Sequence, residues 1–177
     1  MKLIESKTLG TAAASIEFTS IPSDGTDLVV LAALRSSNAL DGQNYGFATL
    51  SINGSTANQT RRNLVGLGSG SPESYSGTSF GLLTNGNTTT ANTFSNSIVY
   101  FANYSGSTNK SISFDTVMEN NGTLAFQEIM AGLWSQTTAI SSLTFTASGS
   151  GATLVAGSTI SLYKITKGSD GIVTTSP

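Results

Sequence analysis

Two acidic residues, Asp115 and Glu119, lie on the polar face of the predicted strand FDTVME and form the most suggestive carboxylate pair in the chain. Paired carboxylates hydrolyse glycosidic bonds when they lie about 5 to 9.5 Å apart. Four residues of extended strand span about 13 Å, so these two groups are too far apart to act together. A cross-strand pairing of this face with Glu128 would be closer, and the sequence leaves it open. The pattern favours a solvent-facing polar strand over a catalytic pair.

Other common catalytic and metal-binding groups are missing from the sequence. The chain has no histidine and no cysteine, which excludes Ser-His-Asp and Cys-His catalysis and zinc bound by histidine or thiolate. Asp24 and Asp27 share the turn PSDGTD, and their oxygens could bind calcium, but turn formation by aspartate explains the pair better. The glycine-rich segment GLGSGSPES lacks the Gly-Lys-Ser/Thr that closes a phosphate-binding loop. We predict a protein that is not an enzyme and needs no cofactor.

Charge is sparse along the whole chain. The 177 residues include eight Lys and Arg and ten Asp and Glu, for a net charge of −2, and only Arg61 and Arg62 are adjacent basic residues. Nucleic-acid binders need a basic stripe to neutralise phosphates, so we expect no nucleic-acid partner. No apolar run is long enough for a membrane helix, and the start, MKLIESKTLG, is too polar for a signal peptide. We expect synthesis in a host cytoplasm and no membrane association.

Apolar residues alternate with polar ones along most of the chain, which predicts β-strands with one solvent-facing side. The clearest examples are ASIEFTS, FATLSIN, SISFDTVME and SLTFTAS. Residues 27–35 and 98–104 are apolar on both sides and predict central strands, or strands covered by loops or a partner. The segment LAFQEIMAGLW fits a helical stripe or a strand with Phe126, Met130 and Trp134 on one face. The β-rich surroundings favour the strand.

Short turn signals rich in Gly, Asn and Ser separate these runs, which predicts an all-β fold. We expect an antiparallel β-sandwich that is jelly-roll-like, with long loops. Residues 1–167 form the expected domain, with 1–12 as an N-terminal strand or arm and 168–177 as a C-terminal tail. The longest loop-like region, residues 66–93, is either a Greek-key crossover or a binding loop.

One predicted strand, GSTISLYKITKG, changes its apolar side along its length. Ile160 and Leu162 share one face, whereas Tyr163 and Ile165 share the other. Either a β-bulge near Leu162 and Tyr163 returns the later residues to the core, or the strand is regular. In the second interpretation another subunit or the chain's own arms cover Tyr163 and Ile165.

Several further side chains could belong to an interface or a binding site. Tyrosines near loops can stack on sugars or anchor an interface, and they are equally common as ordinary strand-end residues. The candidate interface or binding residues are Tyr75, Phe80, Tyr104, Arg61, Arg62, Tyr163 and Ile165.

Five segments, read in order, resemble a family of small virion structural proteins of tailed, marine-type bacteriophages. They are SIEFTSIPSDGTDLVVLAALRSS, LSINGSTANQ, NTFSNSIVYFANYSGSTNKSISFDTVMENN, IMAGLWSQTTAISSLTFTA and GSTISLYKI. The resemblance covers residues 16–165 and implies a jelly-roll-like sandwich on the virion. It also implies a homo-oligomer, expected as a trimer, and offers no catalytic motif.

The resemblance leaves two roles open. In the first, which we favour, the protein is a capsid decoration (cement) protein that bridges and stabilises major capsid subunits, with avidity from many copies. In the second it is a tail-fibre or receptor-binding domain that recognises a host surface glycan through its polar loops. A glycan-degrading enzyme is a third alternative, and the carboxylate spacing opposes it.

Overall fold

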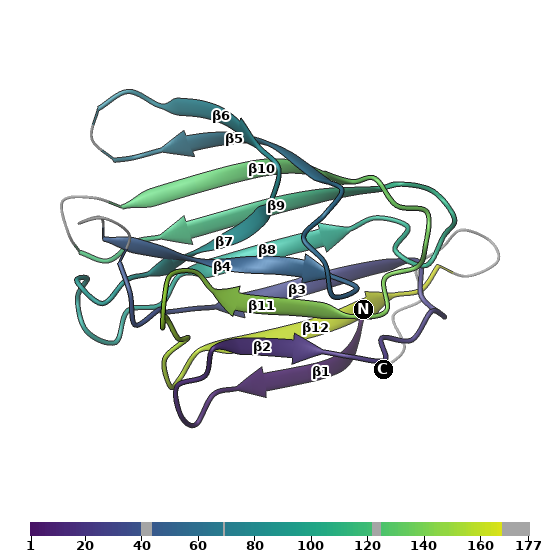
Figure 1. Cartoon of the computed structure of the whole chain (residues 1–177), viewed down its shortest axis with the longest axis horizontal. Coiled ribbons are helices and arrows are strands. Elements are labelled where there is room, and N and C mark those ends of the chain that lie inside the picture. The colour runs from purple at the N-terminus through teal and green to yellow at the C-terminus, as the bar shows by residue number, and fades with distance from the viewer. Residues whose placement is uncertain (40–43, 69, 122–124, 168–177) are drawn as a thin grey trace.

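A computed structural model describes residues 1–39, 44–68, 70–121 and 125–167, which consist of strands and loops (Figure 1). The strands are β1 (Lys2–Thr8), β2 (Ser15–Phe18), β3 (Asp27–Ala33), β4 (Tyr45–Ile52), β5 (Gln59–Gly66), β6 (Glu73–Gly77), β7 (Phe80–Asn85), β8 (Asn96–Phe101), β9 (Lys110–Met118), β10 (Phe126–Trp134), β11 (Leu143–Ala147) and β12 (Thr159–Ile165). The ambiguous segment LAFQEIMAGLW is therefore a strand, as its surroundings predicted.

The strands form two antiparallel sheets that pack as a β-sandwich, which confirms the predicted fold class. The larger sheet has the order β1-β12-β3-β8-β9-β10-β5-β6, and the smaller has the order β2-β11-β4-β7. The pairs β1/β12, β2/β11, β3/β8 and β4/β7 alternate between the sheets, which is the strand pairing of a jelly roll. The hairpins β5–β6 and β9–β10 lengthen the larger sheet beyond β8, and we call these four strands the extension (Figure 1).

The hydrophobic core lies between the two sheets and follows the alternation of the sequence. In β9 every second residue, such as Ile112, Phe114 and Met118, is buried, and the residues between them are exposed. Strands β3 and β8, which are apolar on both faces, are interior neighbours in the larger sheet, as predicted. The predicted N-terminal strand or arm contains β1, which is an edge of that sheet. The predicted C-terminal tail, 168–177, lies outside the described residues.

Residues 66–93, expected to be a loop, contain two strands. The short, polar β6 carries no apolar alternation that the sequence could reveal, and backbone pairing with β5 alone defines it. In contrast, β7 is buried along its whole length because the extension curls over it. The side chain of Gln59 on β5 accepts a 2.7 Å hydrogen bond from the Phe80 amide and donates one of 3.0 Å to the Leu50 carbonyl. Gln59 thus ties the extension to the smaller sheet.

A glycine on β10 allows the extension to approach β7 closely. Gly132 faces inward, and a Cβ at this position would lie 2.8 Å from the ring of Phe80 and 3.1 Å from that of Phe114. These two rings are 5.3 Å apart between centroids and fill the space over the glycine. Farther along, Tyr45 of β4 packs edge-on against Phe126 of β10 at 4.6 Å.

The change of apolar side in β12 occurs without a bulge in that strand. Its pairing with β3 is regular over the whole of β12, so the predicted bulge near Leu162 and Tyr163 is wrong. The register shift lies instead in the neighbouring edge strand, between Leu3 and Glu5 of β1. The strand itself is regular, as the second interpretation states, and cover of Tyr163 and Ile165 by another subunit stays a prediction.

Tyr163 consequently lies on the outer face of the larger sheet, opposite Leu3 on one side and Val29 on the other, and is half-buried. The next residue, Lys164, occupies the inner face where an apolar side chain would continue the core. It lies at the end of the sandwich, and its ammonium group forms a 2.5 Å ion pair with Asp24. The position tolerates a charge because the core ends there and a counter-charge is present.

Candidate functional site

The outer face of the larger sheet exposes a group of large apolar side chains on and beside the extension. These side chains and their exposed fractions are Leu64 (52%), Ile98 (46%), Val117 (38%), Ile129 (53%) and Leu133 (39%). We call this surface the extension face. Contiguous exposed apolar surface on a folded domain marks an interaction site, whereas single exposed apolar residues do not.

The strand register places the apolar side chains in a row. Ile129 of β10 lies directly opposite Leu64 of β5 and opposite Asp115 of β9, and Asp115 lies opposite Ile98 of β8. Side chains that face each other across neighbouring strands are about 5 Å apart, so they form one continuous ridge. Asp115 is the one charged side chain in this ridge, and the other three are apolar.

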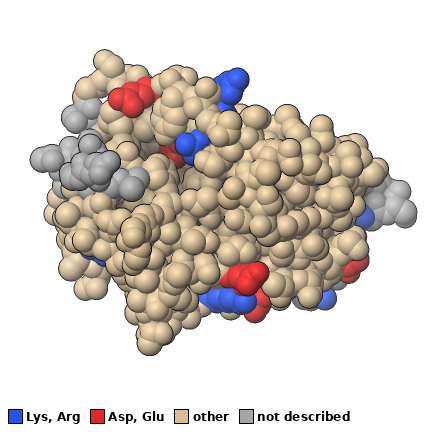
Figure 2. All heavy atoms as spheres, in the orientation of Figure 1, with Lys and Arg blue, Asp and Glu red and all other residues tan. Residues whose placement is uncertain are grey.

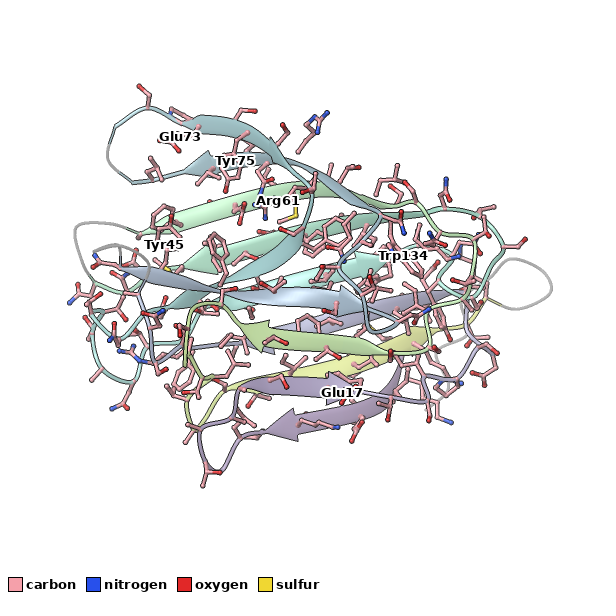
Figure 3. All side chains as sticks on the ribbon, viewed as in Figure 1. Glu17, Tyr45, Arg61, Glu73, Tyr75 and Trp134 are labelled. Carbon is pink, nitrogen blue, oxygen red and sulfur yellow. The ribbon has the colours of Figure 1, made fainter. Side chains whose placement is uncertain are left out.

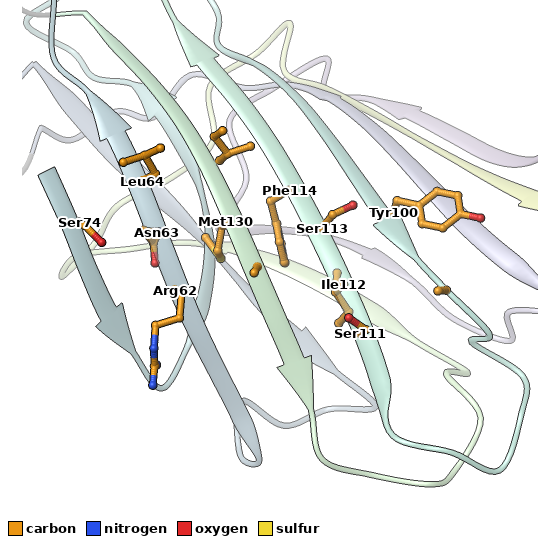
Figure 4. Close-up of a pocket in the computed structure, with 13 residues that line it drawn as sticks. Arg62, Asn63, Leu64, Ser74, Tyr100, Ser111, Ile112, Ser113, Phe114 and Met130 are labelled. Carbon is orange, nitrogen blue, oxygen red and sulfur yellow. The ribbon is translucent and has the colours of Figure 1, made fainter. Parts of the chain in front are cut away.

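The next row of side chains is smaller and forms a groove. Arg62, Ala131, Ser113 and Tyr100 lie opposite one another across β5, β10, β9 and β8. Ala131 and Ser113 are too small to fill the space between the larger residues at the two ends of the row. The result is an open groove of about 710 Å³ (Figure 4). Figure 4 shows Arg62 on one side of it and Tyr100 on the other.

Charge is nearly absent from the extension face. Arg62 and Asp115 are the two charged residues at outward positions of β5, β8, β9 and β10, and both are exposed. Neither forms an ion pair within the described part of the chain. The opposite side of the sandwich, drawn in Figure 2, also shows only scattered charged side chains. The extension face is therefore suited to contact with a surface that has no charges, or with one that is mainly apolar and carries a few charges of both signs.

The carboxylates considered for catalysis do not form a pair. Asp115 points outward from β9, whereas Glu128 on the neighbouring strand β10 points inward and is 2% exposed, so the sheet separates them. Glu119 accepts hydrogen bonds from the amides of Asn120 and Asn121, at 3.1 and 2.7 Å, and stabilises the turn after β9.

The two aspartates considered for calcium binding have other partners. Asp24 pairs with Lys164, which lowers the pKa of the Asp24 carboxyl through their hydrogen bond. Asp27 accepts hydrogen bonds of 2.7 Å from the Tyr100 hydroxyl and 2.8 Å from the Asn103 amide. Within the described ranges no group of three or more acidic side chains lies close enough to hold a metal ion. The described residues also contain no helix of the length and hydrophobicity that crossing a membrane requires.

Two of the seven candidate binding residues lie inside the sandwich, which corrects their expected exposure. Phe80 is 1% and Tyr104 is 0% exposed. The Tyr104 hydroxyl donates to the Pro22 carbonyl and accepts a 3.2 Å hydrogen bond from the Gly25 amide. Burial raises the pKa of Tyr104. Both residues hold the fold together and have no surface to offer a partner.

The adjacent arginines lie on opposite faces of β5 because successive strand residues alternate. Arg62 projects onto the extension face, whereas Arg61 lies on the inner face with its guanidinium 5.8 Å from the ring centroid of Tyr75 (Figure 3). The Tyr75 hydroxyl donates a 3.0 Å hydrogen bond to Glu128, and the Asn63 side chain donates to the same oxygen. Burial, and then the charge of Glu128, raise the pKa of Tyr75.

Tyr163 and Ile165 lie away from the extension, on β12 near the other edge of the larger sheet. Ile165 is partly exposed, and its carbonyl accepts hydrogen bonds from the amide and hydroxyl of Thr26 at 2.8 and 3.0 Å. Among the seven candidate residues, Arg62 alone belongs to the extension face.

The apolar residues of the extension face were not among the sequence candidates, although the sequence held a signal for two of them. Ile129 and Leu133 completed the apparent helical stripe of LAFQEIMAGLW, together with Met130 and Trp134. Because the segment is a strand, the residues of the apparent helical stripe lie on both faces of that strand. The inner ones form the core, and the outer ones are exposed.

No family model matches the chain, and no curated protein and no solved structure shows significant similarity to it.

Proposed function

We propose that this chain is a non-enzymatic structural protein of a tailed-bacteriophage virion. Its role in this proposal is that of an oligomeric capsid decoration protein, which bridges and stabilises major capsid subunits. The observation that carries the proposal is the extension face, where five large apolar side chains are exposed on one surface. Contact of such a surface with water is unfavourable, so a protein that has one is suited to work inside an assembly.

Four further features support this role. The segments quoted above resemble virion structural proteins, and the strand pairing is that of a jelly roll, a fold that recurs in viral shells. Asp115 and Glu128, the cross-strand carboxylates considered for catalysis, point to opposite faces of the sheet. The extension is an addition to the eight jelly-roll strands, so it enlarges the surface available for contact, while its inner side chains Phe114, Met130 and Trp134 join the core.

The groove on the extension face favours a second candidate function, recognition of a host glycan by a tail-associated domain. Its volume of about 710 Å³ lies in the range of ligand sites. Tyr100 and Arg62 lie at its ends and Ser111 and Ser113 line it, and these are groups that can stack on or hydrogen-bond to a sugar.

Imaging of intact particles, with the protein labelled, tests the decoration role. A regular lattice of copies on the head is the expected result, and copies confined to the tail would contradict the proposal. Purified protein should also rebind stoichiometrically to particles that lack it and raise the temperature at which their shells open.

The glycan alternative predicts saturable binding of the purified protein to host-cell surface glycans. A Ser113→Trp substitution would fill the groove without disturbing a buried contact, because Ser113 is exposed. Under the glycan alternative this variant loses binding, whereas Thr146→Trp on the smaller sheet, also at an exposed position, retains it.

A further inference from the structure

We propose that the extension face is the contact surface between two copies of this chain, related by a two-fold axis that crosses β10. This inference deepens the proposed function, on which it rests for its setting in an assembly, by naming a second copy as the partner of this face. It predicts a two-fold contact where the resemblance implies a trimer. Three properties of the face support it: the placement of its charges, its relief and its size.

The two charges of the face are self-complementary. Arg62 on β5 and Asp115 on β9 have opposite signs, and they lie two strand spacings apart across β10 and two residues apart along the strands, about 12 Å in all. They therefore do not neutralise each other within one copy. Neither residue forms a salt bridge with another of the described residues. Consider a two-fold axis that lies in the plane of contact and crosses β10 between Ile129 and Ala131. The axis is perpendicular to the line that joins Arg62 and Asp115 of one copy. It places Arg62 of each copy over Asp115 of the other.

An isologous contact of this kind forms each ion pair twice. A flat apolar partner without charges would leave Arg62 and Asp115 to be desolvated without compensation, which is unfavourable. A second copy supplies a counter-charge to both at once. The charge pattern of the face therefore favours self-association over docking against an unrelated apolar surface.

The relief of the face is self-complementary under the same operation. The ridge is formed by Leu64 and Ile129, and the groove beside it by Ala131 and Ser113. Rotation about the stated axis places Ile129 of one copy over the hollow between Leu64 and Ala131 of the other. Large side chains then enter the space that small ones leave, which is how packed interfaces reach the density of protein interiors.

The size of the face suits a reversible dimer. Strands β8, β9, β10 and β5, about 4.8 Å apart and about 20 to 30 Å long, cover on the order of 500 Å² of flat area per copy. Two copies together bury about 1,000 Å², which is at the lower end of specific interfaces. We therefore expect a dimer that dissociates on dilution, with a dissociation constant in the micromolar range.

Sedimentation equilibrium of the purified full chain from about 1 to 500 µM tests the inference. The expected result is a monomer–dimer equilibrium that Ile129→Asp and Leu64→Asp each shift to monomer. Leu3→Asp is the matched control, because Leu3 is equally exposed (49%) but lies on β1 at the other edge of the sheet. This control retains the dimer. Circular dichroism and thermal unfolding confirm that each variant is folded.

Charge reversal separates the proposed geometry from a general loss of apolar surface. Arg62→Asp alone and Asp115→Arg alone should each weaken dimerisation about tenfold or more, because each places like charges over one another twice. The double variant, Arg62→Asp with Asp115→Arg, restores the opposite signs and should recover most of the affinity. A change that acts through misfolding would not be recovered in this way.

The inference is overturned if the wild-type chain remains monomeric at 500 µM, if it forms a trimer, or if Ile129→Asp leaves the dimer intact. Failure of the double variant to recover dimerisation overturns the stated axis. These results do not depend on where the protein lies on a particle. A protein that dimerises but never binds particles would contradict the proposed function and support the two-fold contact. A protein that binds particles as a monomer would support the proposed function and contradict the two-fold contact.

Discussion

The hydroxyl of Tyr75 on β6 donates a 3.0 Å hydrogen bond to the carboxylate of Glu128 on β10, across the intervening strand β5. Asn63 on β5 donates to the same carboxylate oxygen, so three adjacent strands of the extension share one acceptor. Glu128 is almost completely buried, and within the described residues it has no ion-pair partner. The bond adds a side-chain connection to the backbone pairing that joins the edge strand β6 to β5, and the residues of β6 bury little apolar surface of their own.

We predict that Glu128→Ala lowers the free energy of unfolding by about 1 to 3 kcal/mol, because the buried amide of Asn63 and the partly buried hydroxyl of Tyr75 lose their acceptor. Glu128→Gln keeps an acceptor and nearly the same volume, so its loss is smaller. Urea unfolding of the three proteins measures the difference. Equal stabilities for the Ala variant and the wild type would show that water or another group satisfies both donors.

Arg35 is predicted to hold the segment 86–95 in place. Its guanidinium donates hydrogen bonds of 2.8 to 3.1 Å to the side chains or carbonyls of Thr89, Thr90 and Thr93. A lysine has one ammonium group and cannot reproduce this fork of donors. Arg35→Lys should therefore speed amide hydrogen exchange and proteolysis in 86–95 and cost about 1 to 3 kcal/mol of stability.

The matched control for Arg35 is Arg62→Lys, which changes an exposed arginine whose guanidinium, among the residues that the structure describes, donates only to the Arg61 carbonyl at 3.0 Å. This variant should leave both exchange in 86–95 and the unfolding free energy unchanged to within about 0.5 kcal/mol. If Arg35→Lys behaves like Arg62→Lys, the loop is held by its backbone turns alone.

Tyr104→Phe is predicted to destabilise the fold by about 1 to 2 kcal/mol and to leave any binding activity unchanged. Removal of the hydroxyl leaves the Gly25 amide and the Pro22 carbonyl without their partner in a buried site. The measurement is thermal unfolding combined with the particle-binding assay. Loss of binding by a variant that remains folded would return Tyr104 to the functional residues.

Stability is predicted to fall at alkaline pH in a way that depends on Tyr100. Burial, and then its hydrogen bond to Asp27, raise the pKa of Tyr100 to about 12 from an ordinary value of 10.0. The folded state therefore holds this proton more tightly than the unfolded state does. The stabilisation is complete below pH 10 and is lost as the pH rises towards 12.

The comparison of wild type with Tyr100→Phe isolates this contribution, because Tyr75 and Tyr104, whose pKa values are also raised, titrate in both proteins. The wild type should be the more stable protein at pH 8, and the gap should close between pH 10 and 12. Denaturant unfolding at fixed pH values measures it. A gap that stays constant over this range would mean that Tyr100 ionises equally in both states.

The sequence predicted the strands wherever apolar residues recur at every second position with a polar residue between them, as in β9 and β11. It failed for β6, whose small polar residues have no such pattern, and for the burial of Phe80 and Tyr104, which were expected as binding residues in the loop-like region 66–93 and beside a turn. The alternation of apolar and polar residues within a segment cannot show whether a distant part of the chain packs over that segment. Both residues are buried by strands or turns distant in sequence.

The sequence by itself determined the fold class and the absence of histidine and cysteine chemistry, because these depend on composition and on local period. Only the tertiary structure decided which strands neighbour one another. That choice buries Glu128 while exposing Asp115, and it aligns Leu64 with Ile129 on one surface. Strand register is set by contacts between residues far apart in the chain, so the extension face exists only in the folded sheet.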